Sequence, residues 1–101
     1  MDQQLEKTRV RERSMELQPP SDYKIIYLND DQTSFEFVID SLQNTFDYSQ
    51  DPTVDKAMEI NEQGHGIVAV MPFEIAEQKG VEVLMAARNE GYPLEVRLEQ
   101  A

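Results

Sequence analysis

The sequence predicts an α+β domain, in which a three-stranded antiparallel sheet carries three helices on one face in the order β-α-α-β-α-β. Three short segments that are β-branched, apolar or alternating in polarity predict the strands. Three longer segments with apolar residues at every third or fourth position predict the helices. The 101 residues suffice for one core domain at 23–101, and the polar, proline-terminated stretch at 1–22 predicts a flexible N-terminal extension.

The first strand and the first helix are predicted from two adjacent patterns. The segment Tyr23–Leu28 (YKIIYL) is β-branched and aromatic, which is typical of a strand. Thr33 and Glu36 are spaced as a capping box, because such a hydroxyl and carboxylate satisfy free N–H groups at a helix start. The helix that follows has one apolar face, formed by Phe35, Val38, Ile39, Leu42 and Phe46.

The second helix and the second strand follow in the middle of the chain. Asp51 and Pro52 predict the N-cap and the first position of a helix over about 52–63. The stretch Gln63-Gly64-His65-Gly66 predicts a turn, since glycine adopts unusual backbone angles at little cost. The short apolar segment Ile67–Met71 is then expected to form a strand.

The third helix and the last strand complete the domain. Pro72 opens a predicted helix over about 73–89, Gly91-Tyr92-Pro93 ends it, and Leu94–Leu98 alternates as a strand. Gly80 lowers helix propensity, so we expect another backbone to pack closely against it. The inward face of this helix is expected at Ala76, Gly80, Val83, Leu84 and Ala87.

The negative charge is concentrated in the core domain. Residues 23–101 contain fifteen Asp and Glu against five Lys and Arg, a net charge of −10, whereas residues 1–22 are nearly balanced. Such acidity disfavours nucleic acids and anionic membranes, because phosphate binding requires neutralising cations. The expected partners are basic surfaces or cationic ligands, although acidity that serves solubility alone would give the same composition.

Cysteine and long apolar segments are both missing from the sequence. The lack of cysteine excludes disulfides, thiolate metal ligands and thiol nucleophiles. No apolar run approaches the roughly 18 residues of a membrane span, and the N-terminal MDQQLEKTRV lacks the apolar core of a signal peptide. These features predict a soluble, intracellular protein.

Asn29, Asp30 and Asp31 stand side by side where the first strand must turn into a helix. An EF-hand calcium loop that began at Asn29 would need Gly where Ser34 stands and Glu where Asp40 stands, which argues against calcium. A catalytic carboxylate pair is also disfavoured, because adjacent side chains point apart. The sequence therefore predicts neither a metal site nor a catalytic residue in this turn.

Two interpretations of the acidic turn remain. Its side chains cap the following helix, or Thr33 and Glu36 do so and leave Asn29 and at least one aspartate to hold a cationic group. His65, the single histidine of the sequence, is expected to be an exposed turn residue. No nucleophile–base pair is evident, so we expect a protein that is not an enzyme.

Three stretches of the sequence resemble the ClpS family over about residues 22–100: YKIIYLNDDQTSFEFVID, EIAEQK at 74–79 and Tyr92-Pro93-Leu94-Glu95. The resemblance implies an adaptor that hands proteins with destabilising N-terminal residues to a Clp-type AAA+ unfoldase and peptidase. It implies no cofactor, and it implies a cytoplasmic location, in a bacterium rather than in the stroma of a plastid.

The resemblance also implies a binding site for a substrate N-terminus. Asn29, Asp30, Asp31 and Asn61 would bind the free α-amino group, which is mostly an ammonium at pH 7. An adjoining apolar pocket would take the first side chain, which is Phe, Tyr, Trp or Leu. Its walls would be Thr33, Phe35, Val38, Ala57, Ile60 and Leu94.

Four positions depart from the family pattern. Asn61 stands where the family usually has His, and Ala57 stands where it tends to have Met. Ser34 and Phe35 stand where the family tends to have Pro and Met. The side-chain preference of the pocket therefore stays open, and the alternative is a modulator that binds the unfoldase but has lost or altered its recognition of N-termini.

Docking on the N-terminal domain of the unfoldase is implied for Glu74 and Lys79, which match family positions. A solvated helix face with this spacing would contain the same residues, so only the resemblance points to docking. The extension at 1–22 resembles the flexible arm that engages the unfoldase pore. A small enzyme that uses His65 and the acidic turn is the remaining alternative, and replacement of His65 would test it.

Overall fold

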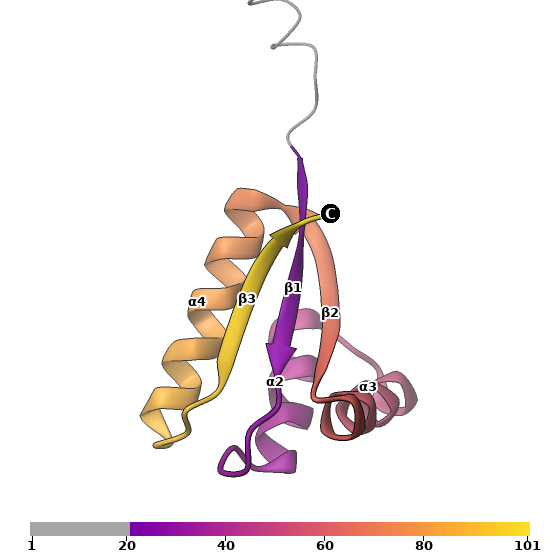
Figure 1. Ribbon diagram of the computed structural model, residues 1–101, viewed down its shortest axis with the longest axis vertical. Coiled ribbons are helices and arrows are strands. Elements are labelled where there is room, and N and C mark those ends of the chain that lie inside the picture. The colour runs from indigo at the N-terminus through magenta and orange to yellow at the C-terminus, as the bar shows by residue number, and fades with distance from the viewer. Residues whose placement is uncertain (1–20) are drawn as a thin grey trace, which may run out of the picture.

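The structure is a computed structural model that describes residues 21–101, and the predicted extension falls on residues outside this range, apart from its last two. Six elements follow in the predicted order: β1 (Asp22–Leu28), α2 (Phe35–Phe46), α3 (Gln50–Gln63), β2 (His65–Pro72), α4 (Phe73–Asn89) and β3 (Glu95–Gln100) (Figure 1). None of the helices in this range is long and apolar enough to cross a membrane.

The sheet is antiparallel and has β1 at its centre, in the order β2-β1-β3. Ile26 lies opposite Ile67 on one side and opposite Arg97 on the other. The helices lie together on one side of the sheet and leave its other face open (Figure 1). The predicted α+β fold with three helices on one face is therefore confirmed.

The hydrophobic core forms where β1 meets the helices. Ile25 and Tyr27 of β1 are fully buried, as is Leu42 of α2. The hydroxyl groups of Tyr27 and Ser41 share a buried hydrogen bond of 2.7 Å, and burial raises the pKa of Tyr27 strongly. This polar pair satisfies two buried hydroxyl groups and so fixes the position of α2 against the sheet.

The start of α2 differs from the prediction. Its N-cap is Ser34, whose hydroxyl oxygen accepts a hydrogen bond from the amide of Phe37 at 3.0 Å. The predicted capping box of Thr33 and Glu36 is therefore wrong. The reason is that the hydroxyl and amide of Thr33 donate to Asp30, so the next hydroxyl in the chain caps the helix.

The start of α3 also differs, because its N-cap is Ser49 rather than Asp51. The carbonyl of Ser49 accepts a hydrogen bond from the amide of Thr53 at 3.1 Å, which closes the first turn. Pro52 lies inside that turn instead of opening it. A proline is tolerated there because the first amides of a helix have no partner within the helix.

The predicted turn at 63–66 is shorter than expected. Gly64 alone reverses the chain, since its φ of 89° lies in the left-handed region and its amide donates to the carbonyl of Ile60 at 2.9 Å. His65 is exposed as predicted, but it is the first residue of β2, opposite Leu28. One left-handed residue is enough here because the strand starts directly after the helix.

A face of small side chains brings α4 against the sheet. Ala76, Gly80, Val83 and Ala87 are buried as predicted, and Leu84 is half-buried. A Cβ added at Gly80 would meet Val96 Cγ1 at 3.8 Å and Leu98 Cδ2 at 4.0 Å, so its neighbours are side chains. The expected close approach of a backbone to Gly80 is wrong, because the side chains of β3 fill this space.

The glycine that permits a close approach is Gly66 of β2. A Cβ at this position would lie 2.7 Å from Cγ1 of the buried Ile60, far inside normal contact. Ile60 belongs to α3, so the absence of a side chain at Gly66 allows α3 to pack directly onto the end of β2. This contact lies at the end of the sheet where β1 stops, because Gly66 pairs with Tyr27 of β1.

Candidate ligand-binding site

Three of the residues predicted to bind an ammonium group, Asn29, Asp30 and Asp31, directly follow the end of β1, and Asn61 lies in the last turn of α3. The amide of Asn29 donates to the carbonyl of Gly64 at 2.9 Å, and Gly64 is the C-cap of α3. This bond ties the loop at 29–34 to the end of the helix that carries Asn61. Asn29, Asp31 and Asn61 are all exposed, so a ligand can reach them.

Asp30 differs from its neighbours because its carboxylate is bound within the loop. Oδ1 accepts hydrogen bonds from the amides of Gln32 at 2.8 Å and Thr33 at 2.6 Å, and Oδ2 accepts one from the Thr33 hydroxyl at 2.7 Å. Burial acts to raise the pKa of Asp30, but these bonds and the positive charge of Arg88 outweigh it and keep this pKa below its ordinary value. Asp30 therefore shapes the loop.

Asp31 is the acidic side chain that the loop leaves available. Its carboxylate forms no hydrogen bond or ion pair with any residue from 21 to 101. The pKa of the adjacent Asp30 lies below its ordinary value because its hydrogen bonds favour the charged form, so a negative charge stands beside Asp31. A cationic group that bound at Asp31 would relieve this repulsion.

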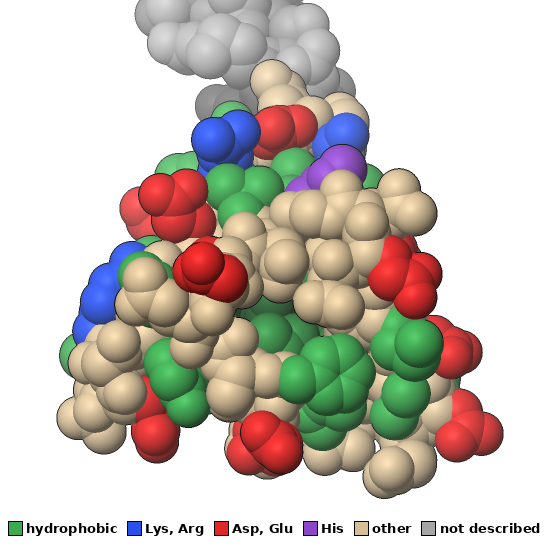
Figure 2. All heavy atoms as spheres, turned by 60° about the horizontal axis from the view of Figure 1, so that its bottom comes forward, with side chains coloured by type: hydrophobic (Ala, Val, Ile, Leu, Met, Phe, Trp, Pro, Cys, Tyr) green, Lys and Arg blue, Asp and Glu red, His purple; other side chains and the backbone are tan. Residues whose placement is uncertain are grey.

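Most of the residues predicted to line the apolar pocket are buried in the core. Four of them are core residues with little exposure: Val38, Ala57, Ile60 and Leu94. Phe35 is 44% exposed, and Thr33 is half-buried between the core and the acidic loop. Figure 2 turns this end of the molecule toward the viewer and shows a recess with hydrophobic atoms at its floor, bordered by polar and acidic side chains.

The connection between α4 and β3 lies beside the acidic loop, because residues of both line one small cavity. Nη1 of Arg88 donates to the carbonyls of Tyr92 and Leu94, both at 2.9 Å. The ring of Tyr92 packs edge-on against Phe37, with 5.5 Å between the ring centroids. Arg88 was missed by the sequence analysis, although a cation in the last turn of a helix is well placed to bind nearby carbonyls.

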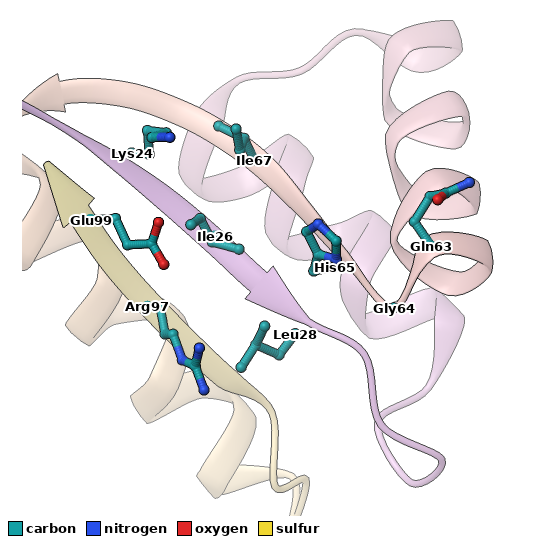
Figure 3. Close-up of a pocket in the computed structure, with 9 residues that line it drawn as sticks. All are labelled: Lys24, Ile26, Leu28, Gln63, Gly64, His65, Ile67, Arg97 and Glu99. Carbon is teal, nitrogen blue, oxygen red and sulfur yellow. The ribbon is translucent and has the colours of Figure 1, made fainter. Parts of the chain in front are cut away.

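A hollow of about 460 Å³ lies on the open face of the sheet (Figure 3). Ile26 and Ile67 form part of its lining, with Lys24 and Arg97 beside them, and His65 lies at its edge. Neither Asp30 nor Asp31 borders this hollow, so it is not the predicted pocket. Within residues 21–101, no three His, Asp or Glu side chains are grouped to hold a metal ion.

Glu74 and Lys79 lie in the first half of α4, at the other end of the sheet from the acidic loop (Figure 1). Glu74 is exposed and Lys79 is half-buried. The topology explains why these residues and the acidic loop lie at opposite ends of the sheet. β2 begins beside the last residue of β1 and ends beside the first residue of β1, and α4 starts directly after β2. A ligand at the acidic loop would therefore leave this part of α4 uncovered.

The protein is a small α+β domain with an acidic loop next to its apolar core at the end of β1. Such a site suits a ligand that has both a cationic and an apolar group. Residues 18–97 match the family model described as ATP-dependent Clp protease adaptor protein ClpS. The chain belongs to the ClpS family, whose members are adaptors of the Clp protease. The resemblance found in the sequence is thereby confirmed.

Individual relatives agree with this assignment. The ATP-dependent Clp protease adapter proteins ClpS of Shewanella loihica and Shewanella denitrificans are each 45% identical over 86 residues, which cover 85% of this chain and 84% of each relative. The solved structure of Agrobacterium tumefaciens ClpS2 bound to L-phenylalaninamide is similar with a TM-score of 0.79 and 34% identity. This match covers 82% of the present chain and 100% of that one.

Proposed function

We propose that this protein binds the free α-amino group and the bulky hydrophobic first side chain (Phe, Tyr, Trp or Leu) of N-degron substrates, and delivers them to a Clp-type AAA+ unfoldase. The observation that carries the proposal is the acidic loop, in which Asp30 is held internally and Asp31 is exposed. An ammonium group has three donors, and Asp31, Asn29 and Asn61 offer oxygen acceptors for them. Each charge-assisted bond contributes about 1.5–3 kcal/mol.

The ligand of the Agrobacterium tumefaciens structure supports this chemistry. L-phenylalaninamide combines a free amino group with a phenyl side chain, and the protein that binds it shares the present fold over 82% of this chain. This end of the chain offers the same two kinds of group, since Asp31 is an exposed carboxylate and Phe35 is an exposed apolar residue. We therefore place the amino group at the loop and the side chain against the apolar wall.

The wall that would receive the first side chain comes from two helices and two loops. Val38 of α2, Ala57 and Ile60 of α3 and the residue before β3, Leu94, are buried, whereas Thr33 and Phe35 lie nearer to solvent. An apolar wall of this kind disfavours a charged side chain, because no described partner would compensate its desolvation. A β-branched side chain would also fit badly, because its bulk lies close to the backbone.

Delivery requires a second surface, for which we propose the exposed part of α4 with Glu74 and Lys79. Its position at the far end of the sheet lets the adaptor hold a substrate and the N-terminal domain of the unfoldase together. We place this activity in the bacterial cytoplasm rather than in a plastid stroma. The acidity of the domain supports a protein partner with a basic surface and disfavours nucleic acid.

The burial of the pocket wall favours one other candidate function. Ala57, Ile60 and Leu94 are each at most 2% exposed, so a side chain can reach them only if the wall opens. If it does not open, the protein would bind the unfoldase and modulate the specificity of the Clp protease, with lost or altered N-degron recognition. Peptide binding separates the two candidates.

The test is fluorescence anisotropy with labelled peptides that begin with Phe, Tyr, Trp, Leu or Met, each paired with an N-acetylated twin. We expect at least one peptide that begins with Phe, Tyr, Trp or Leu to bind and its acetylated twin to fail, because acetylation removes the ammonium charge and two of its donors. Equal behaviour of free and acetylated peptides, or no binding at all, would favour the modulator.

The pH dependence of binding tests the role of Asn61. We expect affinity to be constant between about pH 6 and pH 7, because an amide does not titrate, and to fall above about pH 8 as the α-amino group of the peptide loses its proton. Asn61→His should introduce a loss of affinity on the acid side. The same titration in a His65→Gln background excludes a contribution from that histidine, and an acid-side inflection that persists there would contradict the role of Asn61.

A further inference from the structure

We infer that Arg88 is a positioning residue of the ligand-binding site: from the last turn of α4 it holds the connection that carries Leu94 in place against the acidic loop. This inference rests on the proposed function, because its consequence is the affinity for a peptide N-terminus. Arg88 itself need not contact the ligand. It acts through the loop at 92–94 and through the loop at 29–33.

The first argument is that one side chain binds two carbonyls of the connection. Nη1 of Arg88 donates to the carbonyl of Tyr92 and to that of Leu94, each at 2.9 Å. The second of these bonds is partly buried, so its loss would leave a carbonyl in a poorly hydrated place without a partner. The guanidinium group therefore helps to hold the chain where it enters β3 and supports the position of Leu94.

The second argument is that the helix does not need Arg88 to close its C-terminus. The carbonyl of Ala87 accepts the amides of Glu90 and Tyr92 at 3.0 and 2.9 Å, and the carbonyl of Arg88 accepts the amide of Gly91 at 3.0 Å. These backbone bonds give the carbonyls of Ala87 and Arg88 partners without the Arg88 side chain. The side chain of Arg88 is thus available to hold the residues beyond the helix.

The third argument is that the connection and the acidic loop face each other. Pro93 and Glu95 line a cavity of about 130 Å³ together with Leu28, Asn29 and Asp30. Two acidic residues, Asp30 and Glu95, thus line one small space, and like charges at short range repel. The positive charge of Arg88 acts on Asp30 and helps to keep its pKa low, so it opposes this repulsion and favours the closed arrangement.

The test compares Arg88→Ala with a matched control, Arg97→Ala, which removes an arginine from the open face of the sheet. Affinity for a labelled peptide that begins with Phe and amide chemical shifts in two-dimensional NMR spectra are measured for each folded variant. We expect Arg88→Ala to bind about five- to tenfold more weakly, as the loss of one or two hydrogen bonds predicts, and Arg97→Ala to bind normally. The amides of residues 29–33 should shift in Arg88→Ala without any ligand.

Conservative variants keep the inference testable if Arg88→Ala does not fold. Arg88→Lys retains the charge and the ability to donate to both carbonyls, so we expect it to recover part of the affinity and of the native shifts. Arg88→Gln retains one donor group without the charge and should recover less. A general loss of stability would not produce this order among fully folded variants.

Two results would overturn the inference. Arg88→Ala could bind the peptide as the unmodified protein does, or its spectra could leave the amides of residues 29–33 unmoved. The spectra need no ligand, so they judge the coupling of the two loops even if the unmodified protein binds no peptide. If the unmodified protein binds no peptide, the proposed function is overturned instead. The failure of the inference and the failure of the proposed function are therefore distinguishable.

Discussion

Replacing Asp31 with alanine is expected to weaken the binding of a peptide with a free N-terminal Phe by about 10- to 150-fold, the equivalent of one charge-assisted hydrogen bond. The thermal stability should hardly change, because the Asp31 carboxylate is exposed and forms no hydrogen bond within residues 21–101. The affinity is measured by fluorescence anisotropy and the stability by thermal unfolding, both near pH 7.

Asp30→Ala is the matched control for this prediction. The two residues are neighbours and carry the same charge, but Asp30 accepts three hydrogen bonds from Gln32 and Thr33. Asp30→Ala should therefore lower both the midpoint of thermal unfolding and the affinity, since the loop loses its internal support. An Asp31→Ala variant that kept its affinity would contradict the ammonium site, and the acidic turn would then serve only the loop itself.

The same substitution at two buried glycines is expected to change the free energy of unfolding in opposite directions. Gly66→Ala places a Cβ 2.7 Å from Cγ1 of Ile60, so the Ile60 side chain or the backbone must move, and we expect a loss of about 1–3 kcal/mol. Gly80→Ala adds a Cβ at ordinary contact distances inside α4, where alanine favours the helix by about 1 kcal/mol. Urea unfolding of both variants measures the two changes.

Gly66→Ala also connects the fold with the proposed pocket. Ile60 is 2% exposed and belongs to the proposed wall, so its displacement should lower the affinity for a peptide N-terminus as well as the stability. Gly80→Ala should leave this affinity unchanged, because its neighbours Val96 and Leu98 are outside the site. A Gly66→Ala variant as stable as the unmodified protein would show that Ile60 can rotate away at no cost.

Local patterns in the sequence were sufficient for the order of the elements and for the helix that packs along the sheet. The limits of α4 follow from Pro72 at its start and from the glycine and proline after its end. Its buried face follows from the spacing of Ala76, Gly80 and Val83, because helical periodicity depends only on neighbours along the chain. The resemblance to the ClpS family was likewise visible in the residues around Asn29-Asp30-Asp31.

The tertiary structure decided which polar group bonds to which. Thr33 and Ser34 are adjacent hydroxyl residues that are both suited to cap α2, and only the bonds from Thr33 to Asp30 leave the cap to Ser34. Asp30 and Asp31 are likewise indistinguishable in the sequence, yet one is bound within the loop and the other is exposed. Which of two similar neighbouring residues forms a bond depends on small differences in loop geometry, and the spacing of residues in the sequence does not predict these differences.

Contacts between distant segments were also beyond the sequence. Gly66 rather than Gly80 is the glycine without room for a side chain, because α3 and β2 meet there. The charge of Arg88 acts on Asp30 because α4 packs against β1. Local sequence therefore determined the elements and the residue types of the site, whereas the packing of the elements decided which of these residues are held, which are exposed and which support the others.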